Sequence, residues 1–351
     1  MKNVIALNVR QHRQPLPQRL AQHATVFSVD RRTEDDVFWL KENAEFLNIL
    51  ECTNQPAADV LQHYEVIYEQ IEARLGEFPQ YYRFLLSICM DLEDLGMPGH
   101  KSVALSHWAA QQGLPEAELS DLQRAEAQRL LSRRDFGLRD ARLDERLHRF
   151  INRSDTFAIP NKKASYELTH IVFYLSEYGR RDPGLSRAAI LSLTYAGLLA
   201  YLDQNYDLLA EICIALRYSG EKPSAIWEGA VMAALRATHA TAVANASVFD
   251  DYHAYLVSSW LAAQSGQPCF PLLLEPGPAR FDMASPPARP LRDMSLALSE
   301  TRSTDWLAVR GKIAARLGED GLQLLDAAER STDLFLDFYA GFARATAPAM
   351  A

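Results

Sequence analysis

Residues 166–179 read Tyr-Glu-Leu-Thr-His-Ile-Val-Phe-Tyr-Leu-Ser-Glu-Tyr-Gly and are the most informative stretch of the chain. The pattern predicts an apolar helix that nevertheless carries polar side chains. His170, Tyr174 and Glu177 are spaced i, i+4 and i+7 and so share one helical face, and Glu167 lies one turn before His170. Polar groups in so apolar a helix need partners if they are buried. This helix is therefore the candidate functional site.

The same helical periodicity continues through most of the chain. Residues 57–75 carry an apolar stripe at a spacing of three and four, and residues 33–36 form a capping-box pattern before an apolar run that starts at Val37. Residues 84–96 and 167–179 match weakly, and a Pro-Gly turn follows each. We therefore predict an all-α protein of stacked antiparallel helical hairpins, either an α/α repeat or a toroid. Residues 1–30 are the exception, because their β-branched stretches predict either a short N-terminal β-hairpin or an arm.

Changes in composition predict four regions, with a linker between the first two. Residues 1–153 form an N-terminal helical domain with a short arm, and residues 154–163 are a linker. Residues 164–265 form the helical domain that carries the candidate site. Residues 266–294 are a proline-rich connector, since proline interrupts helices. Residues 295–351 form a C-terminal helical hairpin.

The overall charge gives the protein no general attraction to nucleic acid or to anionic membranes. The chain has 351 residues, with 36 Lys and Arg against 45 Asp and Glu, and a net charge of -9. Residues 124–153 are rich in arginine, but acidic residues are interleaved, which favours a solvated helix with i,i+4 ion pairs. No nucleic acid partner is expected.

Several features indicate a reduced, cytoplasmic protein. The four cysteines are far apart and form no CxxC pair, so buried thiols are expected. The N-terminus is too short and too polar for a signal peptide, and no run of eighteen apolar residues predicts a membrane span. The Walker A, GxGxxG, GxSxG and HExxH motifs are all missing from the sequence.

Three predicted helices place acids and histidines on apolar faces. The first is the helix of His170, and the second carries Asp203, Asp207 and Glu211 at i, i+4 and i+8. The third carries Asp250, Asp251, His253 and Tyr255, with residues 247–250 in capping-box order.

The sequence leaves three interpretations of these residues open. In the first, His170, His253 and Asp207, or another carboxylate, bind Zn, Fe or Mn. In the second, no metal is needed, and His170 is a general acid or base. In the third, the polar groups are a satisfied network that fixes helix register. Under the second interpretation the catalytic candidates are His170, Glu167, Asp207, Glu211 and Tyr174, and Tyr255 and Glu177 bind substrate.

Two short motifs carry a resemblance to known proteins. Residues 166–174 with Glu177-Tyr-Gly, and residues 251–257 reading Asp-Tyr-His-Ala-Tyr-Leu-Val, are similar to paired motifs of uncharacterised bacterial all-helical proteins. The resemblance covers about residues 160–265 and implies that His170 and His253 share one site. Glu177 stands where those proteins have Asp.

The sequence does not decide between an enzyme and a binding protein. The first hypothesis is an enzyme of bacterial secondary or tailoring metabolism that acts on a small molecule or peptide in a polar cleft lined by His, Asp and Glu. The alternative is a helical-repeat scaffold or adaptor that binds a protein partner. The C-terminal hairpin packs either on its own domain or on a second subunit, in which case the protein is a homodimer. No membrane partner is expected.

Overall fold

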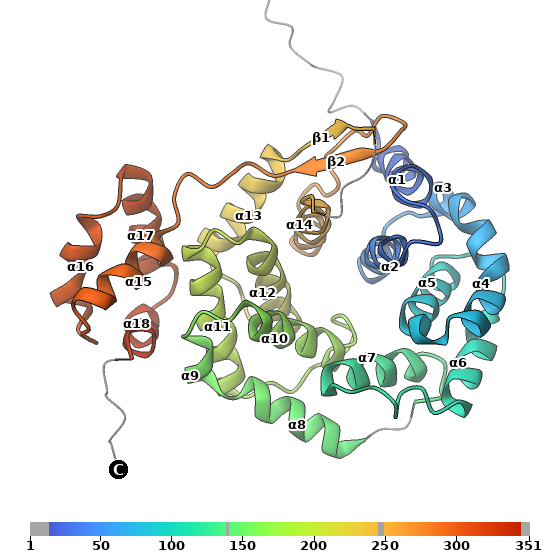
Figure 1. Ribbon diagram of the computed structural model, residues 1–351, viewed down its shortest axis with the longest axis horizontal. Helices are drawn as coiled ribbons and strands as arrows, with labels where there is room; N and C mark the ends of the chain where they lie inside the picture. Colours follow the sequence, from blue (N-terminus) through green and yellow to red (C-terminus); the bar gives the residue numbers. More distant parts are fainter. Residues whose placement is uncertain (1–13, 138–139, 245–248, 345–351) are drawn as a thin grey trace, which may run out of the picture. The chain divides into compact units, whose positions relative to one another are not determined.

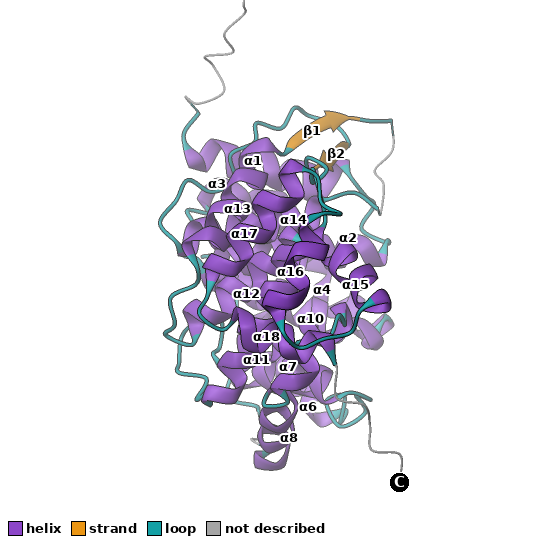
Figure 2. Cartoon of the chain, turned by 90° about the vertical axis from the view of Figure 1, so that its left-hand side faces the viewer, coloured by secondary structure: helices purple, strands orange, loops and turns teal. Residues whose placement is uncertain are grey.

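The computed structural model describes residues 14–137, 140–244 and 249–344. Figure 2 shows that this part of the chain consists mostly of helices, so the predicted all-α fold is confirmed. The chain divides into two compact units, each made of several segments. The first contains the chain up to Leu114, Leu130–Gly137 and Leu235–Met283, and the second contains Pro115–Arg129, Leu138–Ala234 and the chain from Ala284 onward. The predicted domain boundaries and the repeat or toroid arrangement stay predictions.

The first unit contains helices from both halves of the chain and a two-stranded sheet (Figure 1). Its elements are α1 (Leu16–Thr25), a π-helical turn (Val26–Asp30), α2 (Val37–Cys52), α3 (Ala58–Leu61), a 3-10 turn (Gln62–Tyr64), α4 (Glu65–Glu77), a 3-10 turn (Pro79–Tyr81), α5 (Tyr82–Asp94), α6 (Lys101–Gln111), β1 (His239–Ala242), α14 (Tyr252–Gln264) and β2 (Ala279–Asp282).

The second unit is helical in its described part. Its elements are α8 (Ala141–Ile151), α9 (Ser154–Phe157), α10 (Lys162–Leu175), α11 (Arg187–Leu202), α12 (Tyr206–Tyr218), α15 (Pro290–Glu300), α16 (Trp306–Ala314), α17 (Glu319–Ser331) and α18 (Phe335–Ala343). Two further helices, α7 (Asp121–Ser132) and α13 (Ala225–Ala237), begin in the second unit and end in the first.

The helix starts that capping patterns predicted are confirmed where the structure describes them. The Asp36 carboxylate accepts a hydrogen bond from the Phe38 N–H at 2.8 Å, and α2 begins at Val37. At the start of α7, the Ser120 hydroxyl oxygen accepts a hydrogen bond from the Gln123 N–H at 3.1 Å. These bonds satisfy N–H groups that have no partner inside the helix.

The predicted N-terminal hairpin is wrong in its second strand. Residues 3–9 lie outside the described residues, but residues 24–29 belong to α1 and the π-helical turn, not to a strand. Val26 and Phe27 are buried there, and Phe27 stacks on Phe46 and Phe281 with ring centroids 5.4 Å and 5.6 Å apart. Burial in this aromatic core outweighs the local β preference. The antiparallel pair instead joins β1 to β2, with His239 opposite Asp282.

The arginine-rich stretch is not simply a solvated helix. Arg129 is only 4% exposed. Arg133 and Arg134 directly follow α7. Arg133 pairs with Asp91 at 2.7 Å and Arg134 with Asp94 at 2.8 Å, so both contact α5 and not neighbouring residues of α7. The long aliphatic stem of an arginine can be buried when its charged group finds a partner, which is why these side chains are not simply solvated.

A buried ion cluster explains Asp250, which the sequence assigned to helix capping. Ser247 lies outside the described residues, and α14 begins only at Tyr252, so Asp250 precedes the helix. Its carboxylate lies 2.7 Å from Arg31 Nη1, and Glu42 lies 2.9 Å from Arg31 Nε. Burial alone would lower the pKa of Arg31, but hydrogen bonds and the negative charges of both acids raise it overall. Asp250 therefore neutralises a buried cation.

The segments predicted as linker, connector and terminal hairpin contain more structure than expected. Residues 154–163 include α9, which packs on α11. The proline-rich segment contributes β2, and Pro290 begins α15, since proline is tolerated in a first helical turn. The predicted terminal hairpin consists of the four helices α15 to α18. The Trp306 indole N–H donates to Glu329 at 2.6 Å and so joins α16 to α17.

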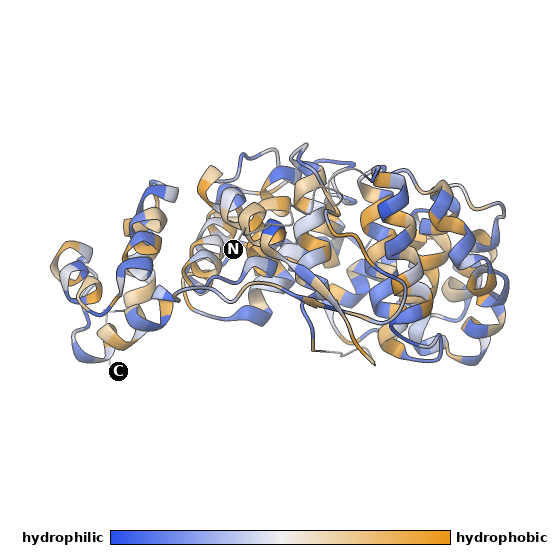
Figure 3. Cartoon of the chain, turned by 90° about the horizontal axis from the view of Figure 1, so that it is seen from above, coloured by the Kyte–Doolittle hydropathy of each residue, from blue (hydrophilic) through white to orange (hydrophobic). Residues whose placement is uncertain are grey.

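Figure 3 shows that individual helices carry both hydrophilic and hydrophobic residues, as amphipathic helices do. Within the described ranges, none of the helices has the length and apolar character needed to cross a membrane. The four cysteines are buried free thiols, as predicted.

We expect Gly197→Ala to destabilise the second unit. A Cβ at Gly197 would lie 2.5 Å from a ring carbon of Trp227, which is 2% exposed and has no room to move. Overpacking of this kind costs about 1–3 kcal/mol, more than the helix propensity that alanine gains. Urea unfolding measures the loss. Gly229→Ala is the control, because no atom lies within 4 Å of its added Cβ and it should stabilise the helix by about 0.5–1 kcal/mol. Equal effects at both glycines would contradict the packing argument.

Candidate functional site

Helices α10 and α12 position the candidate side chains, and Figure 1 shows them beside α11 in the second unit. Asn161 caps α10 by accepting the Ala164 N–H at 3.2 Å, and Asn205 caps α12 by accepting the Leu208 N–H at 3.3 Å. Both helices therefore start at fixed points, which sets the register of the residues that face each other.

A carboxylate, a hydroxyl and an imidazole meet between these two helices. Glu211 on α12 is 1% exposed. Its Oε2 accepts a hydrogen bond from the Thr169 hydroxyl at 2.5 Å, and its Oε1 lies 3.7 Å from His170 Nε2. Buried carboxylates need such partners. The sequence proposed Glu167, Asp207 or Glu211 as the partner of His170, and Glu211 lies in ion-pair range.

Asp207 has a different partner on α10. The Tyr166 hydroxyl donates to its Oδ2 at 2.8 Å. Burial raises the pKa of Tyr166, and the negative charge of Asp207 raises it further, so the phenol stays protonated and can keep donating. Two parallel contacts, Tyr166 with Asp207 and Thr169 with Glu211, therefore hold α10 against α12.

The imidazole of His170 is held on one side and open on another. Its ring stacks on Tyr174 with centroids 6.1 Å apart and lies 5.9 Å from Phe173. Its side chain is 38% exposed, whereas that of Glu211 is 2% exposed. The exposed side of the imidazole can meet a ligand while the buried carboxylate holds its position.

Two residues are not placed as their sequence spacing predicted. Helix α10 ends at Leu175, and Glu177 has a left-handed backbone with φ 49°, so it does not continue the face of His170. Asp203 caps the C-terminus of α11 and pairs with Lys162 at 2.8 Å, so it does not share a helix with Asp207. In both cases the helix ends earlier, or starts later, than uninterrupted periodicity implies. Glu167 does lie on α10, half-buried.

The residues of the third predicted helix belong to the first unit. Tyr255 is fully buried, and its hydroxyl lies 2.7 Å from His23 Nε2. It is therefore a core residue in this structure. His253 Nε2 lies 3.6 Å from Glu45. Of the metal ligands proposed from sequence, His170 and Asp207 belong to the second unit and His253 belongs to the first.

Sequence reasoning missed Tyr166, Thr169 and Arg129. Tyr166 precedes His170 by four residues, so the sequence could have placed both on the same helical face. Arg129 follows the buried Ala125 by four residues, which places it on the inner face of α7. The many charged residues around Arg129 indicated a solvated helix instead, so its burial was not predicted.

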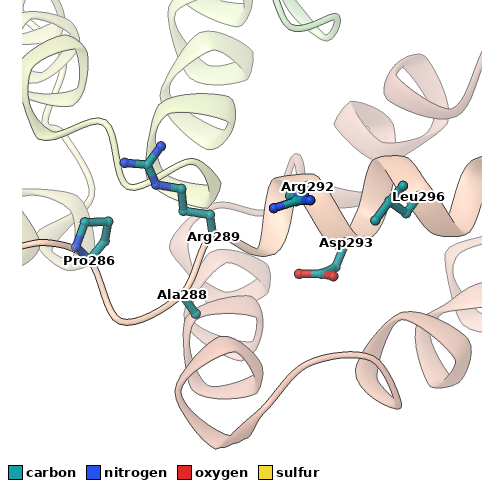
Figure 4. Close-up of a pocket in the computed structure, with 6 residues that line it drawn as sticks. All are labelled: Pro286, Ala288, Arg289, Arg292, Asp293 and Leu296. Atoms are coloured by element: carbon teal, nitrogen blue, oxygen red, sulfur yellow. The ribbon is translucent and has the colours of Figure 1, made fainter.

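A surface pocket of about 410 Å³ lies around the start of α15 and does not coincide with this site (Figure 4). Its lining residues are Pro286, Ala288, Arg289, Arg292, Asp293 and Leu296. Both arginines are exposed, and all six residues come from one short stretch of chain. No function is assigned to it.

The chain matches the family described as a domain of unknown function (DUF6902) over residues 1–345. It therefore belongs to the DUF6902 family, in agreement with the expected resemblance to uncharacterised proteins. No curated protein and no solved structure matches the chain.

Proposed function

We propose that this protein is a cytoplasmic enzyme of bacterial secondary or tailoring metabolism that acts on a small molecule or peptide. His170 transfers a proton in the reaction, and Glu211 positions it. The observation that carries the proposal is the half-exposed imidazole, whose Nε2 lies 3.7 Å from a buried carboxylate oxygen.

The chemistry of this pair supports the proposal. Imidazole is the side chain that exchanges protons near neutral pH, and a neighbouring carboxylate fixes its tautomer and stabilises the cation that forms. Distances slightly longer than a hydrogen bond are common in sites without substrate. Thr169 orients Glu211 through its hydroxyl at 2.5 Å, so the carboxylate is itself held in place.

We expect His170→Asn to slow turnover by about 10²- to 10⁴-fold, the range of general acid–base catalysis. Wild type and variant would be incubated with a bacterial metabolite extract, and compounds consumed only by the wild type would be identified by mass spectrometry. Glu211→Gln should lower the same rate while leaving the imidazole in place. Elemental analysis of the purified protein for Zn, Fe and Mn shows whether His170 acts alone or as a metal ligand.

The matched control for this experiment is His148→Asn, on α8 of the same unit. It makes the same chemical change on a different helix from His170 and Glu211, so turnover should be unchanged. If the His170 and His148 variants consume the compound at the wild-type rate, the proton-transfer role is wrong.

Two exposed leucines favour the second candidate, a scaffold that binds a protein partner. Leu307 on α16 is 82% exposed and Leu336 on α18 is 57% exposed. Large apolar side chains in contact with water are typical of interaction surfaces when they cluster. A scaffold consumes no metabolite. Its molar mass in solution, measured by light scattering, shows whether it is a dimer, and a lower mass for Leu307→Ser or Leu336→Ser would place the interface in this region.

A further inference from the structure

Arg129 is a buried cation, and two of its hydrogen-bonding nitrogens lack a partner in the described part of the chain. It lies on α7 and is 4% exposed. Its Nε and Nη1 atoms have no hydrogen-bond partner among residues 14–137, 140–244 and 249–344. Arginine stays charged in proteins and carries five N–H donors. Since buried charges are normally paired, this guanidinium is an exception that needs an explanation.

Two tyrosines lie against the guanidinium but do not satisfy it. The Arg129 Cζ atom is 4.7 Å from the ring centre of Tyr178 and 5.9 Å from that of Tyr174. Ring faces attract a cation. A ring face gives Nε and Nη1 no oxygen or nitrogen acceptor, however, so these two groups do not make the strongest interaction open to an arginine, with an oxyanion, among the described residues.

An unusual backbone segment places Tyr178 over Arg129. Glu177, Tyr178 and Gly179 all have positive φ, at 49°, 54° and 85°. A Cβ at Gly179 would lie 2.5 Å from the Tyr218 ring, so this position requires glycine. The Ser176 hydroxyl accepts the Gly179 N–H at 3.2 Å and closes the turn. Residues held in uncommon conformations often belong to functional sites.

We infer that Arg129 binds an oxyanion, a carboxylate or a phosphate, on a small-molecule ligand. The planar guanidinium matches the oxygen geometry of both groups. Tyr178, whose ring lies 4.7 Å from the Arg129 Cζ atom, is only half-buried. The acidic group enters beside Tyr178 and accepts the unsatisfied N–H groups.

The position of this site also fits the proposed enzyme. Tyr174 contacts both groups, since its ring stacks on His170 at 6.1 Å and lies 5.9 Å from Arg129. A ligand bound by its acidic group at Arg129 would therefore lie near the proposed proton-transfer group. This placement, unlike the anion binding itself, rests on the proposed function. It restricts the substrate to acidic small molecules.

Thermal unfolding of the full chain tests the inference. The protein would be titrated separately with inorganic phosphate and with a series of mono- and dicarboxylates, at constant ionic strength set with chloride. A ligand that binds only the folded state stabilises it by RT ln(1 + [L]/Kd), so the melting temperature rises with ligand concentration and the curve gives an apparent dissociation constant. We expect stabilisation by at least one of the two anion classes, and the class that acts identifies the acidic group.

Three variants locate the binding. Arg129→Met removes the charge but keeps a similar stem, and we expect the apparent dissociation constant to rise by about 10- to 100-fold, the cost of losing a charged hydrogen bond. Arg129→Lys keeps the charge without the planar group and should weaken binding less. Arg149→Met is the control, since it removes an exposed positive charge from the same unit and should bind like the wild type.

Several results would overturn the inference. One is the lack of any anion effect beyond chloride on the wild type. Another is an equal response of the wild type and both Arg129 variants, and a third is equal weakening by Arg149→Met. If Arg129→Met does not fold, Arg129→Lys decides the outcome alone. His170→Asn should retain anion binding, so a failed turnover experiment with intact anion binding removes the proposed reaction and leaves the anion site.

Discussion

Arg31→Met should lower the free energy of unfolding by about 3–5 kcal/mol, because it leaves buried carboxylates without their counter-charge. The side chains of Arg31 and Asp250 are fully buried and that of Glu42 is 1% exposed. In this variant Arg32 still pairs with Glu42 at 2.7 Å, so Asp250 is the carboxylate that loses more of its counter-charge. Urea unfolding measures the effect.

Two further variants test whether charge causes this loss. Arg280→Met removes an arginine that is 48% exposed and pairs with Asp282, and it should cost less than about 1 kcal/mol. Adding Asp250→Asn to Arg31→Met should recover part of the stability, since the amide oxygen can still accept the Phe281 N–H without a net charge. If the double variant is less stable than Arg31→Met, lost packing and not an unpaired charge is the main cause of the destabilisation.

Lowering the pH from 6.5 to 4 should destabilise the first unit by about 3 kcal/mol through His23 alone. Burial lowers the pKa of His23 from 6.5 to about 4; the positive charge of Arg19 acts in the same direction and a hydrogen bond to the Arg19 carbonyl opposes them. The unfolded chain therefore binds the proton first. The contribution of neutral His23 to the free energy of unfolding is complete above pH 6.5 and is lost as the pH falls toward 4.

The geometry around His23 agrees with a neutral imidazole. Nδ1 lies 2.7 Å from the Arg19 carbonyl and so carries the proton, while Nε2 accepts from the Tyr255 hydroxyl at 2.7 Å. The stability curve is best measured in a His63→Gln background, because burial lowers the pKa of His63 as well. NMR titration gives an independent measurement, and a folded His23 that titrates near pH 6.5 would contradict the prediction.

Local features of the sequence predicted individual helices well. The helix expected to begin at Val37 does so, and the helix expected from Tyr166 onward is part of α10. Periodicity and capping act within a few residues of one another, so one sequence contains the whole signal. Where tertiary burial competes with local preference, as for residues 24–29, the sequence predicted a strand that the structure replaces with helix.

The candidate site was predicted only in part. His170 and Glu211 were both named, but the contact between them joins residues on separate helices. The sequence could not show that His170 contacts Glu211 and not Asp207, because the register of α10 on α12 depends on packing along the whole of both helices. Glu177 was misplaced since the end of α10 depends on a left-handed turn that the helical pattern does not reveal.

The sequence by itself determined the helical class, most helix positions and the side chains capable of proton chemistry, because these follow from residue type and short-range spacing. Only the tertiary structure decided which acid faces His170, that Asp250 neutralises Arg31, and that Arg129 is buried without a hydrogen-bond acceptor for Nε and Nη1 among the described residues. Those outcomes depend on which surfaces are removed from water together, and burial is a property of the folded chain and not of any one segment.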